Sequence, residues 1–427
     1  MAALTGCGDS SGPPAPTLAV AAGDKQSGWL GTTLPIPLSV VVTSESGTPL
    51  PGATVDWRVA AGGGTLSAAS AVTDAMGRAA VSLTLGGKAG LERVEASVGN
   101  GGGGKASATA VFYATGILGR PTIFHYDGAS WKIEFQAPDS APVSLNAIWG
   151  TSPSMIIAVG SQCEASQWVQ YNGTTWTVTD NPYNPCPGSW FDESVSVAGS
   201  SPSDIFVVRN NAYMFWNAGS ISHFDGTSWT QMYPHGCPGS VYCGLAYING
   251  IWSGSPTWAT AVGDSGLIVQ YDGTAWRAAA SGTTRNLHGV WGIGSGASSS
   301  IFAVGDSGTI AHFDGSTWQQ QASGTTQPLY GIWGASASDV FAVGLGGIIL
   351  HYDGTTWSQQ QSGAYTELRA VWGTSGKSVF VVGSQSILHY DGSSWTMMPI
   401  STLPAPLHLR GVWGTSPTNV YAVGRAP

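Results

Sequence analysis

Tyr126-Asp127-Gly128-Ala129-Ser130-Trp131 is the first of seven copies of one short pattern in this 427-residue chain. The pattern is an aromatic residue, Asp or Asn, Gly, two small residues and Trp, and its later copies end at Trp176, Trp229, Trp276, Trp318, Trp357 and Trp395. A second unit lies between the copies, and its Trp-Gly pair recurs at Trp149, Trp291, Trp333, Trp372 and Trp413, with Trp252-Ser253-Gly254 and Ala198-Gly199 in the two remaining places. Both units therefore occur seven times, at a period of roughly 40 residues.

Each repeat has the pattern of four short strands. In one repeat the expected strands are Leu368 to Trp372, Ser378 to Val382, Ile387 to Tyr390 and Ser394 to Met397. These stretches are β-branched and aromatic, and Gly-containing turns such as Asp391-Gly392 separate them. Four strands repeated at this period are typical of β-propeller blades. The sequence predicts an all-β chain with a seven-bladed propeller over residues 117–427.

The order of the half-repeats predicts how the ring closes. The array begins with the second half of a blade, Thr122 to Trp131, and ends with the first half of one, Leu409 to Gly424. If these halves share one sheet, the propeller is closed by pairing of its termini. Closure of this kind leaves only short, protected sheet edges.

The recurring aromatic and His residues are explained by the scaffold. Large rings at fixed positions are what packing between blades requires. Five repeats carry a His directly before the turn pattern and the other two carry Gln170 and Gln270, the five being His125, His223, His312, His351 and His389. A shared hydrogen-bonding role tolerates Gln, whereas a metal site would not. We therefore expect neither a metal nor a cofactor.

The Asp-Gly-x-x-Trp turn resembles the Asp-box of sialidase-type, kelch-like propellers, although it lacks the residue between Asp and Gly. That resemblance implies a structural turn remote from any active site. It assigns a scaffold role to Asp127, Asp225, Asp272, Asp314, Asp353 and Asp391. Asn172 in the same place agrees, because a neutral amide can cap the same turn.

Residues 17–116 form a region of a different kind. It contains Gly47-Thr48-Pro49-Leu50-Pro51-Gly52, Val55-Asp56-Trp57, Thr73 to Ala79 and Leu85-Gly86-Gly87-Lys88-Ala89-Gly90. These motifs, in this order, resemble intimin/invasin-type bacterial Ig-like domains, which implies a β-sandwich that acts as a spacer. The residues agree, since Leu38 to Val42 and Ala80 to Leu85 are strand-like and Trp57 suits a sandwich core.

Residues 1–16 combine Leu4-Thr5-Gly6-Cys7 with a linker rich in Ser, Gly and Pro. The four residues resemble the lipobox of bacterial lipoproteins, which implies lipidation of Cys7. Only six residues precede Cys7, without a basic segment or a full apolar core, so this is not a complete signal peptide. A truncated start would account for this, and a chance match is the alternative.

The composition restricts the partners. The chain has 24 acidic and 15 basic residues, a formal charge of −9, and only 9% charged residues. A nucleic-acid or anionic-membrane partner is not expected, because no basic stripe is available to neutralise phosphates. No apolar run is long enough to span a bilayer, so we expect membrane attachment only through a lipid anchor.

The remaining cysteines, Cys163, Cys186, Cys237 and Cys243, lie in loops that lengthen two of the repeats. We expect disulfides, with Cys237–Cys243 and Cys163–Cys186 favoured among the three connectivities. Zinc binding by the four thiolates is the alternative, but the spacing has no Cys-x2-Cys knuckle.

A binding site is expected where the repeats differ, because a scaffold repeats and a site does not. Three residues before the inner-strand Trp the chain places unlike polar side chains, namely Asn146, Asn249, His288, Tyr330, Arg369 and Arg410. We expect these at the mouth of the central channel, on the face that also carries the Cys loops with Trp190 and Tyr242. The alternative is that they only line a water-filled channel.

These features predict a non-catalytic recognition or adhesion protein, extracellular or on the outer-membrane surface, whose propeller loops bind a glycan or a surface protein. A propeller-fold glycoside hydrolase or lyase is the alternative. Such an enzyme needs paired carboxylates, and outside the repeated turns only Asp180, Asp192, Glu193 and Glu367 are expected to reach the variable face. A structural subunit that self-associates is a further alternative.

Overall fold

The chain is divided into two compact units, with the boundary between Gly119 and Arg120. The structure is a computed structural model, and it describes residues 15–29, 31–86, 90–99, 106–117, 120–137, 144–162, 167–180, 191–213, 216–233, 246–400, 403 and 407–426. Every regular element in these ranges is a strand or a short 3₁₀ turn. No helix among them is long and apolar enough to cross a membrane.

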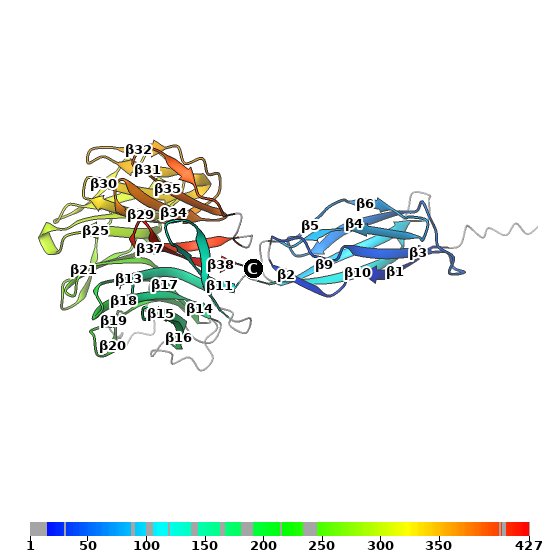
Figure 1. The fold of residues 1–427 in the computed structure, drawn as a ribbon, viewed down its shortest axis with the longest axis horizontal. Helices are drawn as coiled ribbons and strands as arrows, with labels where there is room; N and C mark the ends of the chain where they lie inside the picture. The colour runs from blue at the N-terminus through cyan, green and yellow to red at the C-terminus, as the bar shows by residue number, and fades with distance from the viewer. Residues whose placement is uncertain are drawn as a thin grey trace, which may run out of the picture. The chain divides into compact units, whose positions relative to one another are not determined.

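The first unit contains two main sheets and a two-stranded one (Figure 1). The three-stranded sheet has the order β1 (Thr17–Ala22), β3 (Leu38–Thr43), β7 (Arg78–Val81). The five-stranded sheet has the order β2 (Gln26–Trp29), β10 (Ala106–Ile117), β9 (Gly90–Gly99), β4 (Thr54–Ala61), β6 (Ser70–Val72). The short strands β5 (Thr65–Leu66) and β8 (Leu83–Thr84) pair with each other.

The core of this unit follows from the alternation of its strands. Every second residue of β3, beginning at Leu38, is buried. Trp57 of β4 is buried and lies 5.5 Å from the ring of Phe112 of β10. One expected strand, Ala80 to Leu85, was wrong: it divides at Ser82 into β7 and β8, which belong to different sheets. The main chain of Ser82 instead hydrogen-bonds to Ser67, on the β5 side.

A buried carboxylate organises the glycine-rich loops of the first unit. Glu92 is 2% exposed, and its two oxygens accept hydrogen bonds from the backbone N–H groups of Gly63, Gly64 and Gly86 at 3.0–3.1 Å. A Cβ at Gly64 would lie 3.2 Å from Glu92 Oε2 and 2.8 Å from the carbonyl oxygen of Thr84. These glycines therefore let the main chain approach the carboxylate closely enough to satisfy it.

Glu92→Gln is expected to destabilise the first unit by about 1–3 kcal/mol, because an amide has only one oxygen to accept bonds from three backbone donors. The change should appear as a lower Tm for the calorimetric transition of this unit. Glu45→Gln, at an exposed loop position, is the matched control and should change stability by no more than about 0.5 kcal/mol. Equal effects of the two substitutions would contradict the anchoring role of Glu92.

The second unit contains seven groups of four antiparallel strands within the described residues (Figure 1). Six of them follow the chain in order. The first three are β13 (Ser144–Ser152), β14 (Met155–Gln162), β15 (Gln167–Tyr171), β16 (Trp176–Asp180); β17 (Phe191–Ser201), β18 (Asp204–Tyr213), β19 (Trp216–Phe224), β20 (Trp229–Tyr233); and β21 (Ile248–Ser255), β22 (Trp258–Gly263), β23 (Ile268–Tyr271), β24 (Trp276–Ala279). β14 also pairs with β17 through Ser161 and Gln162, which joins two of these blades into one sheet.

The next three blades are the most regular. They are β25 (Leu287–Ile293), β26 (Ser300–Gly305), β27 (Ile310–Phe313), β28 (Trp318–Gln321); β29 (Leu329–Ser336), β30 (Asp339–Gly344), β31 (Ile349–Tyr352), β32 (Trp357–Gln360); and β33 (Leu368–Ser375), β34 (Ser378–Gly383), β35 (Ser386–Tyr390), β36 (Trp395–Met397). Four 3₁₀ turns complete the inventory, namely η1 (Asp264–Gly266), η2 (Gly296–Ser298), η3 (Asp306–Gly308) and η4 (Leu345–Gly347).

The seventh sheet combines both ends of the unit. Its order is β12 (Trp131–Gln136), β11 (Arg120–Tyr126), β38 (Asn419–Ala426), β37 (His408–Ser416). β11 and β38 pair antiparallel from Arg120 opposite Ala426 to Tyr126 opposite Val420, and they lie side by side in Figure 1. The innermost strands β13, β17, β21, β25, β29, β33 and β37 each contact the next, and β37 contacts β13. The described strands thus form a ring of seven blades.

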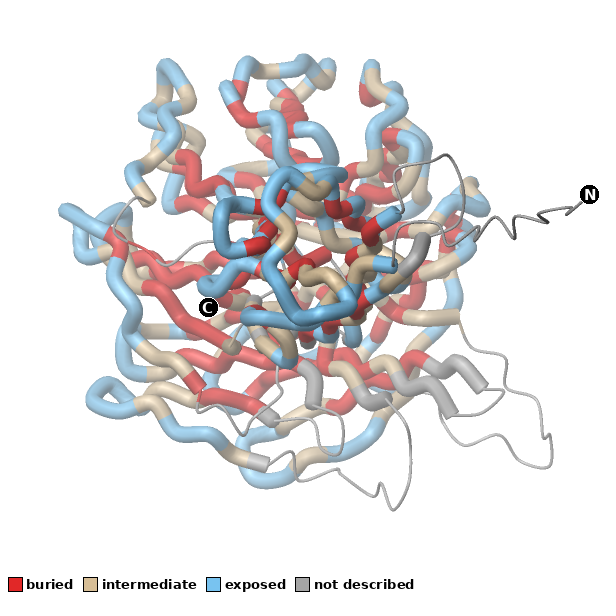
Figure 2. Tube along the Cα trace, turned by 90° about the vertical axis from the view of Figure 1, so that its right-hand side faces the viewer, coloured by how far each residue is buried: buried red, intermediate tan, exposed pale blue. Residues whose placement is uncertain are grey.

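The Trp-Gly pattern fits the packing between blades. A Cβ at Gly334 would lie 2.6 Å from the ring of Trp291, on the preceding blade. The same relation holds between Gly373 and Trp333, so each Gly makes room for the Trp of the blade before it. Inside each blade the second strand is buried along its length, as in β30, whose residues 340–343 are all 0% exposed. Figure 2 shows this as buried strands ending in exposed turns.

The Asp-Gly turns and the His residues have scaffold roles. Asp353 Oδ1 accepts hydrogen bonds from the backbone N–H groups of Thr355 and Thr356 at 2.8 Å, and Asn172 makes the equivalent pair of bonds. Hydrogen bonds from Thr355, first from its side chain and then from its backbone, help to lower the pKa of Asp353 to about 2. His351 stacks on Phe341 and bonds to Asp339 at 2.8 Å.

Candidate functional site

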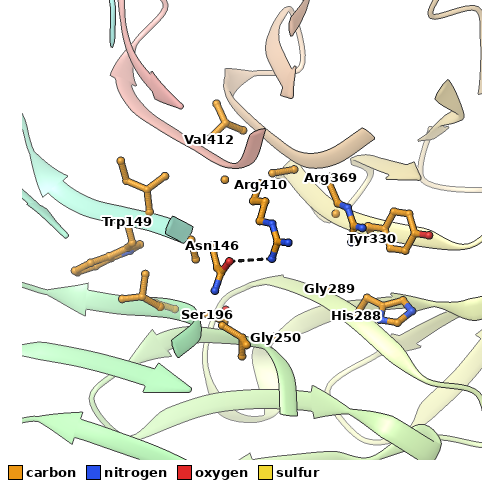
Figure 3. A pocket seen from close by; sticks show the side chains of 18 of the residues that line it. Asn146, Trp149, Ser196, Gly250, His288, Gly289, Tyr330, Arg369, Arg410 and Val412 are labelled. Atoms are coloured by element: carbon orange, nitrogen blue, oxygen red, sulfur yellow. Dashed lines mark hydrogen bonds between the residues drawn. The ribbon is translucent and has the colours of Figure 1, made fainter. Parts of the chain in front are cut away.

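The seven innermost strands surround a cavity of about 280 Å³, which we call the central cavity. Residues from all seven strands line it, and Asn146, Asn249, His288, Tyr330, Arg369 and Arg410 are among them. The structure thus brings together the six polar residues that precede the inner-strand Trp positions (Figure 3). Their role in binding a ligand remains a prediction.

A β-bulge positions each of these six side chains. In β29 the residue pairs run from Leu329 opposite Gly344 to Gly331 opposite Val343, so Tyr330 is the extra residue. The same irregularity occurs in every innermost strand at the same place, and the extra residues are Asn146, Val195, Asn249, His288, Tyr330, Arg369 and Arg410. A bulge turns a side chain away from the regular alternation. We call these seven residues the bulge ring.

Small residues after each bulge allow the innermost strands to approach one another. A Cβ at Gly250 would lie 2.9 Å from the carbonyl oxygen of His288 on the next strand. A Cβ at Gly331 would lie 2.8 Å from the carbonyl oxygen of Arg369. Larger side chains would push the strands apart, so the small residues keep neighbouring members of the bulge ring close together.

The bulge ring and the Asp-Gly turns lie at opposite ends of the blades. β29 pairs antiparallel with β30, which places Leu329 opposite Gly344, whereas the turn after β31 follows Tyr352, which lies opposite Val340 at the other end of β30. The face formed by these turns is called the turn face below. The variable loops between blades begin at the other end, beside the bulge ring.

Arg410 and Asn146 form the first contact within the bulge ring. Nη1 of Arg410 donates a 2.9 Å hydrogen bond to Oδ1 of Asn146, as Figure 3 shows. Nδ2 of Asn146 donates to Oε1 of Glu193 at 2.9 Å, and that oxygen is 3.9 Å from Nη1 of Arg410. Arg410 is 44% exposed, so its guanidinium is held in place and still open to solvent.

Two further members of the bulge ring are held by acidic residues from 3₁₀ turns. Nδ2 of Asn249 donates to Oδ1 of Asp264 in η1 and to the carbonyl oxygen of Leu287, both at 2.9 Å. Nε2 of His288 lies 2.7 Å from Oδ1 of Asp306 in η3. Each carboxylate therefore fixes the orientation of one side chain of the bulge ring by accepting a charge-assisted hydrogen bond from it.

Tyr330 and Arg369 form a stacked pair. The guanidinium carbon of Arg369 lies 4.5 Å from the centre of the Tyr330 ring, and Nη2 of Arg369 is 2.7 Å from Oε1 of Glu367. Burial raises the pKa of Tyr330, and the Glu367 carboxylate adds to the rise while Arg369 opposes it. The phenol is therefore neutral at physiological pH and can donate or accept a hydrogen bond.

Positive charge accumulates on one side of the bulge ring. Burial lowers the pKa of Arg410, an effect that Glu193 opposes and Arg369 increases. Burial also lowers the pKa of Arg425 in β38 to about 10, and the charge of Arg410 contributes. Burial and the charges of Arg410 and Arg425 lower the pKa of His408 as well. A lowered pKa favours the neutral form of His408, so the cations here are Arg369, Arg410 and Arg425; an anion bound among them would be stabilised.

Sequence reasoning missed two acids and one geometric feature. The expectation that only Asp180, Asp192, Glu193 and Glu367 reach this face was wrong, because Asp264 and Asp306 also contact the bulge ring. The repeated Gly-Asp-Ser-Gly, at Gly263 and Gly305, was the available signal. The bulges had no signal in the residue pattern, and Val195 occupies the one bulge without a polar residue.

Several predicted residues lie outside the part of the chain that the structure describes. These are Trp190, Tyr242, the four loop cysteines Cys163, Cys186, Cys237 and Cys243, and Cys7, and the side chains of Asp180 and Asp192 also lie outside it. Disulfide formation and lipidation remain predictions. Within the described ranges no group of three or more His, Cys, Asp or Glu residues is arranged to hold a metal ion.

The comparisons with known proteins concern the two units separately. Residues 33–113 match the bacterial Ig-like domain (group 1) family, which agrees with the resemblance seen in the sequence. No curated protein matches the chain. One similar solved structure, YCF48 bound to D1 peptide, is 15% identical and has a TM-score of 0.48, with 67% of this chain and 95% of that chain covered.

Two more solved structures have comparable likeness. YCF48 from Cyanidioschyzon merolae is 14% identical with a TM-score of 0.48, covering 67% of this chain and 97% of its own. The WD40 repeats of RRP9 are 9% identical with a TM-score of 0.47, covering 72% of this chain and 99% of their own. The assignment of a propeller rests on the sheet order described above, and these likenesses carry no argument about a ligand.

Proposed function

We propose that this chain is a non-catalytic recognition protein whose bulge ring and surrounding loops bind a glycan, with the Ig-like unit as a spacer. The observation that carries the proposal is the set of seven bulges. They present Asn, Val, Asn, His, Tyr and two Arg side chains at equivalent places, whereas the turn face repeats one motif. Unlike side chains that converge on one cavity are typical of a recognition site.

The chemistry of the bulge ring favours a glycan over a wholly apolar ligand. Amides, an imidazole, a phenol and guanidinium groups donate and accept hydrogen bonds, as sugar hydroxyls require. Trp149, Trp372 and Trp413 are also among the residues that line the cavity.

Catalysis is not part of the proposal. Glu193 bonds to Asn146, Glu367 pairs with Arg369, and Asp264 and Asp306 bond to Asn249 and His288. Each acid is thus used to orient a neighbour. A hydrolase of propeller fold would instead need two carboxylates positioned on either side of a glycosidic bond.

A location at the cell surface follows from the same proposal. The residues that match the bacterial Ig-like family would hold the propeller away from the envelope, and lipidation at Cys7 would supply the anchor. A label on an exposed position of the propeller in intact cells tests this placement directly. Labelling only after lysis would contradict it.

Arg369→Ala and Arg410→Ala should each weaken glycan binding about tenfold or more, because both guanidinium groups are partly exposed at the cavity. Their Tm values should change little, since surface-exposed substitutions usually alter stability by less than about 0.5 kcal/mol. The measurement is a glycan and cell-wall polysaccharide array probed with the full chain and confirmed by titration.

Saturable array binding that both substitutions reduce would support the proposal. Binding that neither substitution changes would move the site away from the bulge ring. An array without any signal would instead favour a protein partner or self-association, which sizing of the full chain would detect.

A further inference from the structure

Two departures from the repeat lie in the loop before β33. The loops before three successive innermost strands read Ser281 to Leu287, Ser323 to Leu329 and Ser362 to Leu368. In the third loop, Tyr365 replaces the Thr of the other two and Glu367 takes the place of Asn286 and Pro328. Because sites lie where repeats differ, the sector from β29 to β37 is a candidate part of the site.

The 3₁₀ turn next to this loop is also different. The backbone N–H of residue 345 bonds to Pro328, as those of Asp264 and Asp306 bond to Tyr247 and Asn286, so the three positions are equivalent. Leu345 therefore stands where two other blades have an acid, and it is 40% exposed. This turn therefore brings no carboxylate to the sector, whose own acid, Glu367, is paired with Arg369.

Tyr365 adds an exposed aromatic ring at the same place. It is 91% exposed, the most exposed of the large hydrophobic residues in the described ranges. Its loop packs against η4, where Ser362 Oγ donates a 2.6 Å hydrogen bond to the carbonyl oxygen of Gly347. It lies in the same loop as Glu367, which pairs with Arg369 of the bulge ring. A flat exposed ring stabilises a sugar by contact with its C–H face.

Arg369 and Arg410 carry unused donors in this sector. Each guanidinium has five N–H groups. Among the described residues, Arg369 contacts Glu367 and Tyr330, and Arg410 contacts Asn146 and Glu193. The two arginines come from adjacent innermost strands, β33 and β37, which contact each other. A carboxylate placed between them would receive charge-assisted hydrogen bonds from both.

Resting on the function proposed above, we propose that the glycan is acidic: a uronate carboxylate binds between Arg369 and Arg410, and the neighbouring sugar lies on Tyr365. The cavity volume of about 280 Å³ suits one end of such a chain, with the remaining sugars outside. Tyr330, which lines the same cavity, is then positioned to bond a hydroxyl group of the bound unit.

The test is calorimetric titration of the full chain with tetrasaccharides of galacturonate, glucuronate and mannuronate, each beside its methyl ester. The ester keeps the sugar and removes the charge. At least one acid should bind about tenfold or more tightly than its ester, since charge-assisted bonds are about twice as strong as neutral ones. Raising the salt concentration should weaken only the acid.

Matched variants assign the contacts. Arg410→Gln should abolish the difference between acid and ester, whereas Arg277→Gln, which removes a cation that is 70% exposed on the turn face, should preserve it. Tyr365→Ala should weaken both forms about 3- to 10-fold. Thr326→Ala, at the equivalent place in the preceding loop, should change neither.

The outcomes separate this inference from the function on which it rests. Equal binding of acid and ester overturns the acidic class and leaves glycan recognition standing. If none of the three acids binds but a neutral glycan binds on the array, the acidic class is likewise overturned and glycan recognition stands. No binding of the acids together with a silent array overturns both.

Discussion

A chain that ends at residue 407 is expected to lose its folded propeller. This truncation removes β37 and β38, the inner half of the sheet that joins the two ends of the unit. The buried side chains of Leu409, Val412, Val420 and Val423 are lost with them. At about 1.5–3 kcal/mol for each, their burial contributes about 6–12 kcal/mol. That is comparable with the whole stability of a typical domain, about 5–15 kcal/mol.

Calorimetry and hydrogen exchange of the truncated chain measure this loss. The transition of the propeller should disappear, and amides in strands distant from the cut, such as β26 and β30, should lose protection. The Ig-like unit should keep its own transition, which serves as the internal control. A monomeric truncated chain that retains protected amides in β26 and β30 would show that the ring does not depend on pairing of its ends.

Asp204→Ala is expected to cost about 1–3 kcal/mol of folding stability, the range for leaving a buried hydrogen-bonding group without its partner. Asp204 is 1% exposed and lies 2.7 Å from Nε2 of His223. It also accepts hydrogen bonds from Ser200 in its own blade and from Ser253 Oγ in the next one. The substitution would remove the hydrogen-bond partner of the His223 ring, whose side chain is only 14% exposed.

Asp204 lies beside the two positions at which the Trp-Gly pattern is irregular. Ala198 stands where other blades have a Trp that packs on the next blade, and in that next blade Ser253 replaces the Gly that would receive the Trp. The hydrogen bond from Ser253 to Asp204 therefore joins two blades that lack the usual Trp contact. This pairing gives a physical reason for two departures that seem unrelated in the sequence.

Asp339→Ala is the matched control for Asp204→Ala. Asp339, like Asp204, is the first residue of the second strand of its blade, and its Oδ1 lies 2.8 Å from Nε2 of His351. Its side chain, however, is 33% exposed. Its substitution should cost about 1 kcal/mol or less, because water can replace the lost partner. Midpoints of urea unfolding would compare the two variants, and equal losses would contradict the role given to burial.

The Asp204 pair also predicts a dependence on pH. Burial alone would raise the pKa of Asp204, but hydrogen bonds from His223 and Ser200 outweigh it and lower the pKa below its ordinary value. A lowered pKa adds stability above the pKa of the unfolded chain and loses it as the pH falls through the folded pKa. The stability difference between the wild type and Asp204→Asn should therefore shrink on acidification below about pH 4.

The fold could be predicted because its rules repeat. The Trp-Gly pairs and Asp-Gly turns each encode a local contact, so their sevenfold recurrence predicts the blades and the half-repeats predict the sheet shared by both ends. The division of residues 80–85 between two sheets could not be predicted, since Ala80 to Leu85 alternates like one strand. Only tertiary pairing separates the halves.

The candidate site could be predicted in part. Arg369 and Arg410 both lie three residues before an inner-strand Trp, and this shared position predicted that they belong to one site. Equivalent residues of a closed ring converge, and both residues line the central cavity. The bulges, the contribution of Asp264 and the exposure of Tyr365 depend on hydrogen-bond register and loop packing. The bulges and the exposure of Tyr365 produce no pattern in the residues themselves, whereas the repeated Gly-Asp-Ser-Gly was a signal for Asp264.

The most direct test of the central claim compares two double variants of equal charge for binding to the strongest ligand on the array. Arg369→Ala with Arg410→Ala removes two cations from the bulge ring, and Lys132→Ala with Arg277→Ala removes two from the turn face, where they pair with Asp127 and Asp272. The bulge-ring variant should lose binding by about a hundredfold or more, and the turn-face variant should bind like the wild type. Equal affinities of the two variants would contradict recognition at the bulge ring.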